Sequence, residues 1–553
     1  MKKTLFILFV LSMACLLAAC GGGSTGNTDT PAPQSTPPAS NQAQSTPAPT
    51  APTTSAPPAA PTENVGPEGQ QYGGTFRIIG GDTNMQIGLP FECLQISDQL
   101  TLTPTGEGLV RETTGGEIVP WLAESFQPDM ENSEIRFFLR KGITFYDGSP
   151  LNAEVVYWNI QKAKEHGDLN PAILGAEVRD EYEVALLLDG YSNAVLHMLG
   201  SQAYDLASKE YFDKNGAEKA RDYPVTTGPF KLKERTPGYR LVFERNDDYW
   251  IEGMPYLDEV ELVQIADPMT QIATMLAPTS EAADMLNTVS AEQVATLRDS
   301  GMNLSIDHRL ATGPTCLWPS SANEDSPLAI YEVRLAVANA INRQSICDAR
   351  GFGILSPATQ LLTTGYKGNI PDANYYSYDP EKAREYLAQA GYPNGFSTSL
   401  IASTTGTDAD TVVILQSMLG DVGITAEVEF LEQAAITEIR LTKGWEGLYV
   451  GGILNTANTT SSFRMSIDPD YQYNISTWRP AEEMRGPYVQ SRSTLLVEHE
   501  IVQQVHRMLM DNMAVIPIYD SYRTFVLRDT IQDSGLGDWG NGTWWLPHQT
   551  WKS

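Results

Sequence analysis

The sequence predicts an α/β protein from about residue 72 onward, and two patterns carry this expectation. The first is a strand–helix–strand unit. Residues 397–403 and 425–431 are short apolar segments on either side of a helical pattern at 410–419. Two strands joined by a helix of this length need a crossover connection, so part of a sheet is expected to be parallel.

The second pattern is a helix whose two ends are both marked. Asp379 can cap the helix, Pro380 stands at its first helical position, and Gly391 follows its last turn. Ala383 and Leu387 then fall on one face of the helix. Asp, Pro and Gly are each favoured at the helix position that they would occupy here, so the pattern predicts a helix over about 380–390.

Hydrophobic periodicity predicts the remaining elements. A turn at 145–148 is expected to lead into the first predicted helix. The predicted strands are 135–139, 241–244, 260–265 and 515–519, and the further predicted helices are 153–164 and 495–512.

The N-terminal residues predict export. Lys2 and Lys3 precede an apolar run that is too short to span a bilayer, and Leu17-Ala18-Ala19-Cys20 follows. A basic head, an apolar core and small residues before a cysteine are typical of a lipoprotein signal peptide. We therefore expect residues 1–19 to be removed and the Cys20 thiol to be acylated, for example with palmitate. No later apolar run reaches spanning length, so this lipid is expected to be the membrane anchor.

Residues 20–71 are expected to form a disordered tether. After Cys20 the segment is rich in Pro, Thr, Ser and Ala and contains no Lys or Arg. Such a composition cannot bury enough apolar area to offset its ordering entropy. The functional module is therefore predicted to begin near Tyr72. A tether this long suits a monoderm envelope, but the sequence leaves monoderm and diderm envelopes both open.

The net charge of the chain limits the kinds of partner that it can bind. The chain has 37 basic and 68 acidic residues, a formal net charge of −31. An anionic surface is repelled by phosphate backbones and anionic lipid heads, which argues against nucleic-acid binding. Three cysteines remain after Cys15 and Cys20. A disulfide between Cys316 and Cys347 and three separate buried thiols that include Cys93 are both open interpretations.

We find no motif for catalysis or for a metal. His499 begins a segment similar to a zinc-protease helix, but Gln503 stands where the second ligand is needed. We expect His499 and His506 to lie on a solvated helix face. The glycines at 535–540 match a dinucleotide fingerprint, yet only 13 residues follow them, too few for the required helix and strand. The expectation is a protein that is not an enzyme and has no cofactor.

Several segments together resemble the extracellular solute-binding proteins of family 5, the peptide/nickel-binding lipoproteins of ABC importers. The similar blocks recur in the family's order over most of residues 72–553. They are residues 120–126 (PWLAESF), 137–151 (FFLRKGITFYDGSPL), 227–230 (TGPF), 246–250 (NDDYW), 333–343 (VRLAVANAINR) and 379–383 (DPEKA). Most of these blocks are expected to be structural: Asp147-Gly148 as a turn, and Tyr249-Trp250 as packing residues.

The resemblance implies a two-lobed α/β fold of the periplasmic-binding-protein type II, or Venus-flytrap, kind with discontinuous lobes. Residues 72–266 and 525–553 would form lobe one, and residues 267–524 lobe two. Strands 260–265 and 515–519 are the expected crossovers. Closure of the hinge around a ligand would signal loading to a permease and ATPase. The protein is thus expected to act as a monomer outside the cytoplasm, anchored to the cell membrane.

The resemblance also indicates candidate ligand residues. Peptide binders of the family carry a Gly-Trp-x-x-Asp loop whose carboxylate holds the ligand's amino group. In the corresponding stretch, 449–458, the tryptophan is absent and either Asn455 or Thr456 replaces the aspartate. This change removes a charge-assisted hydrogen bond. The other candidate ligand residues are Asp98 (a compensating carboxylate), Trp318 and Tyr449 (flat apolar contacts) and Asn458.

The leading hypothesis is a binding protein that captures peptides, or a related small polar solute, for an ABC importer. A non-peptide ligand in the same transport role is the first alternative, and oligosaccharides, capped peptides and other neutral solutes all fit it. A surface receptor or adhesin without a transport role is the second, and an exported hydrolase is the third. The ligand and the permease cannot be named from the sequence.

Overall fold

The structure is a computed structural model of the 553-residue chain. It divides into two units, residues 1–62 and 63–553, and the following account concerns the second. The described residues are 69–80, 87–92, 100–113, 116–167, 169–278, 282–287, 290–302, 304–371, 373–404, 409–453, 455, 458–468, 475–494, 497–536 and 545–553. The predicted signal peptide, Cys20 and nearly all of the predicted tether lie outside these ranges.

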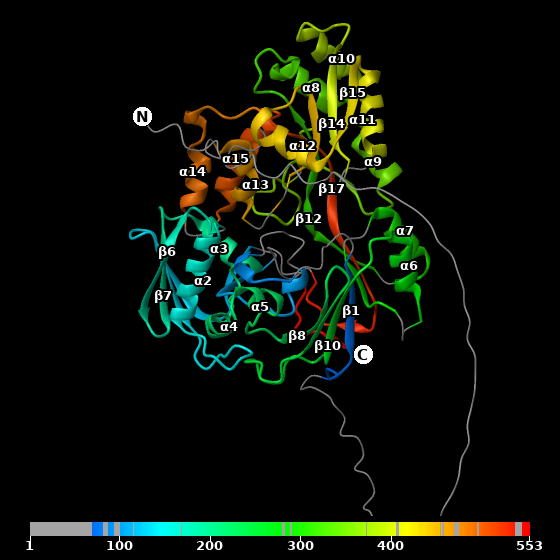
Figure 1. The fold of residues 1–553 in the computed structure, drawn as a ribbon. Coiled ribbons are helices and arrows are strands. Elements are labelled where there is room, and N and C mark those ends of the chain that lie inside the picture. Colours follow the sequence, from blue (N-terminus) through cyan, green and yellow to red (C-terminus); the bar gives the residue numbers. More distant parts are fainter. Residues whose placement is uncertain are drawn as a thin grey trace, which may run out of the picture. The chain divides into compact units, whose positions relative to one another are not determined.

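One large mixed sheet contains most of the strands (Figure 1). Its order is β15-β14-β16-β12-β17-β11-β1-β10-β9-β8, and β13 (Ser356–Pro357) pairs with β17 off this path. β14 runs parallel to both β15 and β16, and β1 runs parallel to both β10 and β11. The strands are β15 (Ile424–Leu431), β14 (Phe396–Ser403), β16 (Leu448–Gly452), β12 (Leu304–Pro319), β17 (Ile516–Leu527), β11 (Met285–Asn287), β1 (Thr75–Gly80), β10 (Glu259–Gln264), β9 (Arg240–Arg245) and β8 (Phe230–Thr236).

Two long strands join the two parts of this sheet. At one end, residues 304–306 of β12 pair with residues 524–526 of β17, beside β11. Further along, residues 311–317 of β12 pair with residues 516–522 of β17, beside β16. The predicted crossover strand 515–519 is thus the start of β17. The other predicted crossover, 260–265, is β10, which lies between β1 and β9. β12 is the second strand that runs through both parts.

A separate antiparallel sheet lies in the N-terminal half, and Figure 1 labels its strands β6 and β7. Its order is β4-β5-β7-β6, and β5 confirms the strand predicted at 135–139. The Asp147 carboxylate accepts hydrogen bonds from Ser149 and Ser208, which fixes the predicted turn. Asn152 then caps α2 (Ala153–His166). The four strands are β4 (Ala123–Asp129), β5 (Glu134–Leu139), β6 (Ile173–Asp180) and β7 (Glu183–Leu188).

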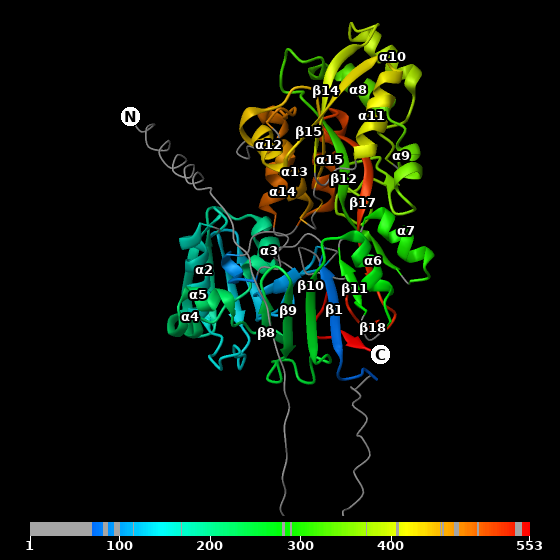
Figure 2. The ribbon, with the colours of Figure 1, turned by 45° about the vertical axis from the view of Figure 1, so that its right-hand side comes forward.

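The predicted strand–helix–strand unit is confirmed. α11 (Ala409–Asp421) connects β14 to β15, and the two strands pair in parallel over their full length. α10 (Pro380–Gln389) is capped by Asp379, as its sequence predicts. Figures 1 and 2 show α8, α10 and α11 beside β14 and β15. The remaining helices of this half are α8 (Tyr331–Ala340), α9 (Arg343–Arg350), α12 (Gln433–Glu438), α13 (Thr459–Ile467), α14 (Gly486–Ser493) and α15 (His499–Asp511), with the short helices η3 (Pro327–Ala329), η4 (Ile439–Lys443) and η5 (Glu482–Met484).

The predicted helix 495–512 starts later than expected. α15 begins at His499, because Glu498 has an extended backbone and serves as its N-cap. In the N-terminal half the helices are α3 (Asn193–Leu199), α4 (Lys209–Asn215), α5 (Ala217–Asp222), α6 (Pro268–Leu276) and α7 (Ala291–Asp299), with η1 (Pro90–Glu92) and η2 (Gln202–Tyr204). Four short strands form two antiparallel pairs: β2 (Val110–Glu112) with β3 (Ile118–Pro120), and β18 (Ile531–Gln532) with β19 (Trp551–Lys552).

The buried apolar side chains form separate clusters. The largest cluster, here called the large core, takes its members from residues 316–519, on β12, β14–β17 and the helices around them. A second cluster, here called the small-sheet core, lies under the four-stranded sheet and includes α3. A third joins β1, β9 and β10 to Trp545 near the C-terminus. α6 and α7 share a fourth cluster with Ile79 and Val526.

The structure separates the two interpretations of the cysteines. Cys316 and Cys347 are both free and buried. The open possibility of a Cys316–Cys347 disulfide is therefore not realised in this structure, and Cys93 lies outside the described residues. In the part of the chain that is described, we find no helix with both the length and the apolar character that crossing a membrane requires.

Candidate functional site

The predicted ligand loop follows β16 and is held against β12. β12 carries a register irregularity next to Gly313, whose φ is +110°. A Cβ at Gly313 would lie 1.8 Å from the Ile453 carbonyl oxygen and 3.0 Å from the Asn455 backbone nitrogen. Only glycine permits this close approach. The chain therefore places Asn455 directly beside β12, one of the two strands that join the parts of the sheet.

Asn455 is buried, and its side chain lacks a hydrogen-bonding partner among the described residues. The residue is 4% exposed, and neither its amide nitrogen nor its amide oxygen is paired within this part of the chain. A buried amide without partners is costly, so such a group in a folded protein calls for an explanation. A bound ligand or ordered water that both donates and accepts would satisfy it. Thr456, the other candidate for this position, lies outside the described residues.

The first turn of α13 adds two more polar groups of the same kind. The hydroxyl groups of Thr459 and Thr460 are buried, and within the described ranges neither has a partner. Asn458 caps the helix by accepting a hydrogen bond from the Ser461 backbone N–H at 3.1 Å. A helix N-terminus carries a partial positive charge. Asn455, Thr459, Thr460 and this helix end lie within six consecutive residues of the chain and are here called the α13 site. Their neutral side chains and the helix end suit a neutral or anionic group better than an ammonium.

The two aromatic candidates belong to the large core. Trp318 is 0% exposed, and its indole nitrogen donates to the Gly451 carbonyl at 3.0 Å. Tyr449 is also buried, and its ring lies against Trp445 and the Arg440 guanidinium. Both side chains support β16, so their contact with a ligand stays a prediction. Asp98 lies outside the described residues.

Glu107 is a buried carboxylate that the sequence did not single out. Its two oxygens accept from the indole nitrogens of Trp121 (2.9 Å) and Trp250 (3.0 Å) and from the hydroxyls of Tyr249 (2.7 Å) and Thr227 (2.8 Å). Burial raises its pKa, although Arg111 and the hydrogen bonds oppose the shift. Because every lone-pair direction is used, Glu107 acts as a structural centre. The predicted packing role of Tyr249-Trp250 is confirmed.

A small polar cavity lies beside this centre. It has a volume of about 10 Å³, roughly the space of one water molecule, and its lining includes Gly106, Arg111 and Asp205. One carboxylate oxygen of Asp205 and the Nε of Arg111 have no partner among the residues described. Burial raises the pKa of Asp205 well above its usual value. The cavity is therefore suited to hydration and is too small for a solute.

The two histidines on α15 do not form a solvated stripe, and that expectation was wrong for His506. His506 is fully buried: its Nε2 accepts from the Leu361 N–H at 3.1 Å, and its Nδ1 donates to the Gly368 carbonyl at 2.9 Å. His499 accepts from the Gly368 N–H at 3.0 Å. Both rings thus hold the loop 361–370 on the helix. Among the described residues no cluster of His, Cys, Asp and Glu has the arrangement of a metal site.

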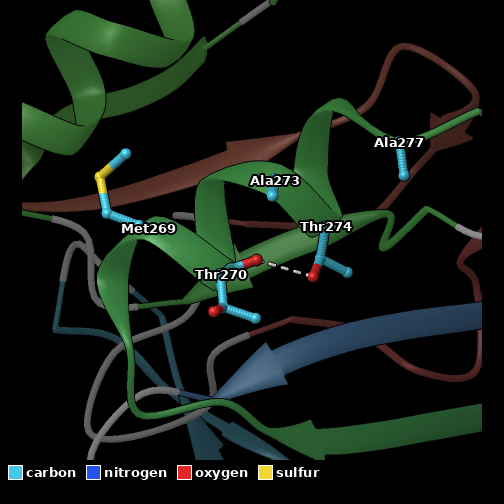
Figure 3. A pocket seen from close by; sticks show the side chains of 5 residues that line it. All are labelled: Met269, Thr270, Ala273, Thr274 and Ala277. Carbon is cyan, nitrogen blue, oxygen red and sulfur yellow. Dashed lines mark hydrogen bonds between the residues drawn. The ribbon is translucent and has the colours of Figure 1, made fainter.

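A larger hollow lies on the exposed face of α6 and has a volume of about 460 Å³. Figure 3 shows its lining side chains, and the Thr274 hydroxyl donates to the Thr270 carbonyl of the same helix. Met269, which is 69% exposed, is the largest of these side chains. No charged side chain lines the hollow in the part of the chain that the structure describes: its residues are Met269, Thr270, Ala273, Thr274 and Ala277. The hollow therefore offers little polar recognition, in contrast to the α13 site.

Two bodies joined by paired long strands define a class of fold, the two-lobed α/β binding protein, and solved structures agree. HbpA2 from Haemophilus parasuis has a TM-score of 0.76 at 20% identity, over 87% of this chain and 100% of that chain. DppA from Helicobacter pylori in complex with the peptide STSA has a TM-score of 0.69 at 20% identity, over 87% and 98% of the two chains. The predicted fold class is confirmed.

The sequence places the chain within this class. The family described as bacterial extracellular solute-binding proteins, family 5 Middle, matches residues 117–474, more than half of the chain. The chain therefore belongs to the family 5 extracellular solute-binding proteins, which are binding proteins and not enzymes. The glutathione-binding protein GsiB of Escherichia coli (strain K12) is 31% identical over 323 residues, 56% of this chain and 60% of that protein. The chain thus matches about three fifths of that relative's length.

Proposed function

We propose that the protein is the solute-binding component of an ABC importer and captures a peptide or a related small polar solute between its lobes. Family membership supports this role, as does the similarity to a glutathione-binding protein and to a structure that holds the peptide STSA. The loaded protein would then deliver the solute to the permease and ATPase subunits of the importer. A monomer suffices for this role.

The α13 site carries the proposal on ligand class. Its unpartnered groups are one carboxamide and two hydroxyls, contributed by Asn455, Thr459 and Thr460. None of them is charged, so the site lacks the carboxylate that would stabilise an ammonium group by a charge-assisted hydrogen bond. A ligand with a neutral polar group here, such as a capped peptide or another neutral solute, therefore fits better than a peptide with a free amino end.

β12 and β17 are the proposed hinge. They are paired along most of their length, and each contacts both parts of the large sheet. The division into residues 72–266 with 525–553 and residues 267–524 stays a prediction. The cluster that α6 and α7 share with Ile79 and Val526 favours placing these helices with lobe one.

The anchor is proposed from the sequence alone. Acylation of Cys20 would hold the protein outside the cytoplasm on the cell membrane, with residues 20–71 as the tether. Mass spectrometry of the mature N-terminal peptide tests this: a diacylglyceryl cysteine at position 20 is expected. An intact residue 1, or an unmodified cysteine, would contradict it.

Calorimetric titration of the purified protein tests the ligand class. Matched tripeptides with free and N-acetylated amino ends form one pair of ligands, and an oligosaccharide is the third. We expect the acetylated peptide to bind at least as tightly as the free one. Asn455→Asp should shift the preference toward the free amine about tenfold, because it restores the charge-assisted bond. Absence of binding by every peptide would remove peptides as the ligand class, and an unchanged preference in the variant would remove Asn455 from the site.

A further inference from the structure

A buried carboxamide on α3 contacts two helices of the large core. Asn193 is the first residue of α3 and is 1% exposed. Its Nδ2 donates to the Ser491 carbonyl at 2.8 Å and to the Thr494 carbonyl at 3.2 Å, at the end of α14. Its Oδ1 accepts from the Nδ2 of Asn458 at 3.3 Å. These partners lie about 265 to 301 residues away in the chain.

The contact joins two separately packed bodies. α3 is anchored in the small-sheet core through Val195, Leu196 and Leu199. α13 and α14 are anchored in the large core through Phe463 and Tyr488. Figures 1 and 2 both show the end of α3 next to α13 and α14. Asn193 therefore bridges the lobes at a point away from the paired strands β12 and β17.

The partner Asn458 also belongs to the α13 site. Its Oδ1 caps α13 through the Ser461 N–H, while its Nδ2 reaches Asn193. Each of the two carboxamides thus uses both of its ends. A ligand that orders the first turn of α13 would also fix the group that Asn193 binds. Closure and occupation of the site are then coupled through a single residue.

We propose that Asn193 is a closure latch: a positioning residue that holds the two lobes together and links their closure to the α13 site. The inference rests on the proposed function, since it assumes that the lobes separate. Hydrogen bonds that exist only in the closed conformation shift the equilibrium toward that conformation by their own free energy. Opening breaks the contacts of Asn193 to Ser491, Thr494 and Asn458 together.

The latch is tested on the ligand-free full-length protein, so the outcome does not depend on knowing the solute. Spin labels at Leu174→Cys and Val413→Cys report the distance between the bodies. These positions are 52% and 55% exposed, on β6 and α11. Cys15→Ser, Cys20→Ser and Cys93→Ser together provide the background, because the two remaining cysteines, Cys316 and Cys347, are buried. Double electron–electron resonance then gives the populations of short and long distances.

Three variants distinguish a latch role of Asn193 from a purely structural role in packing. Asn193→Ala should lower the closed-to-open ratio about tenfold, since it removes at least two buried hydrogen bonds. Asn458→Asp keeps an equally good cap for α13 but loses the donor to Asn193, so a decrease of about threefold is expected. Asn215→Ala, at the end of α4, is the matched control and should leave the distances unchanged.

Two results would overturn the proposal. One is a distance distribution for Asn193→Ala that equals that of the unsubstituted protein. The other is an equal shift in the Asn215→Ala control. A purely structural role would lower the urea midpoint of unfolding and leave the distances alone, so the midpoint is measured in parallel. Failure of the solute titrations would remove the proposed function without changing this readout.

Discussion

Acidification should destabilise the protein through His506. Burial lowers the pKa of this histidine to about 4, from an ordinary value near 6.5. The geometry agrees with a neutral ring, since Nε2 accepts from the Leu361 N–H while Nδ1 donates to the Gly368 carbonyl. A second proton on Nε2 would point at the Leu361 N–H and break that hydrogen bond.

The sign and size of the effect follow from linkage. Between pH 6.5 and pH 4 the unfolded chain binds a proton at His506 that the folded protein does not, so stability falls as the pH falls. Each pH unit in this window is equivalent to about 1.4 kcal/mol. At pH 5 the folded state should therefore have lost about 2 kcal/mol relative to pH 7.5 through this one group.

Urea unfolding of the unsubstituted protein and of His506→Gln, each at pH 7.5 and pH 5, isolates the contribution. Glutamine can donate and accept but does not titrate. The stability advantage of histidine over glutamine should shrink by about 2 kcal/mol between the two pH values. An advantage that is the same at both would refute the assignment of a depressed pKa to His506.

Three further substitutions test other parts of the structure. Glu107→Gln should lower the free energy of unfolding, measured in urea, by about 2–4 kcal/mol. The new NH₂ group would face two hydrogen-bond donors whichever of the two oxygen positions it occupies. An unchanged free energy of unfolding would contradict the four-donor arrangement. Burial raises the pKa of Asp520 to about 7, so the folded protein keeps a proton that the unfolded chain loses at lower pH. The stability that this proton contributes is present at pH 4 and is lost as the pH rises through 7. Asp520→Asn should accordingly gain stability relative to the unsubstituted protein between pH 5 and pH 8, and a constant difference would count against this. Gly313→Ala should cost about 2 kcal/mol or more and weaken solute binding, since the positive φ and the 1.8 Å approach to Ile453 both resist a Cβ; an unaltered midpoint would be evidence against that packing.

Local signals predicted the elements whose ends are chemically marked. Asp379 and Pro380 define the start of α10, and the alternation of apolar segments around residues 410–419 defines the parallel pair β14 and β15. These features depend on neighbours in the sequence, so a single sequence contains them. β12 was not predicted, because its partners β16 and β17 come from distant parts of the chain.

The candidate site was only partly predictable, for the same reason. The stretch containing Asn455 and Asn458 was found by its resemblance to a family loop. The burial of Thr459 and Thr460, and the reach of Asn193 across nearly 300 residues to Ser491, depend on tertiary packing. For His506, the local spacing led to a wrong prediction. A histidine seven residues from another on a helix has the spacing of a solvated stripe, yet the loop 361–370 covers it.

A crystal structure of the protein with the solute that copurifies with it would test the account most directly. We predict that the solute lies between the lobes, with a neutral polar group within about 3.2 Å of the Asn455 carboxamide. Asn193 should retain its bonds to Ser491 and Asn458 in that structure. A solute bound elsewhere, or held at Asn455 by an ammonium group, would contradict the account.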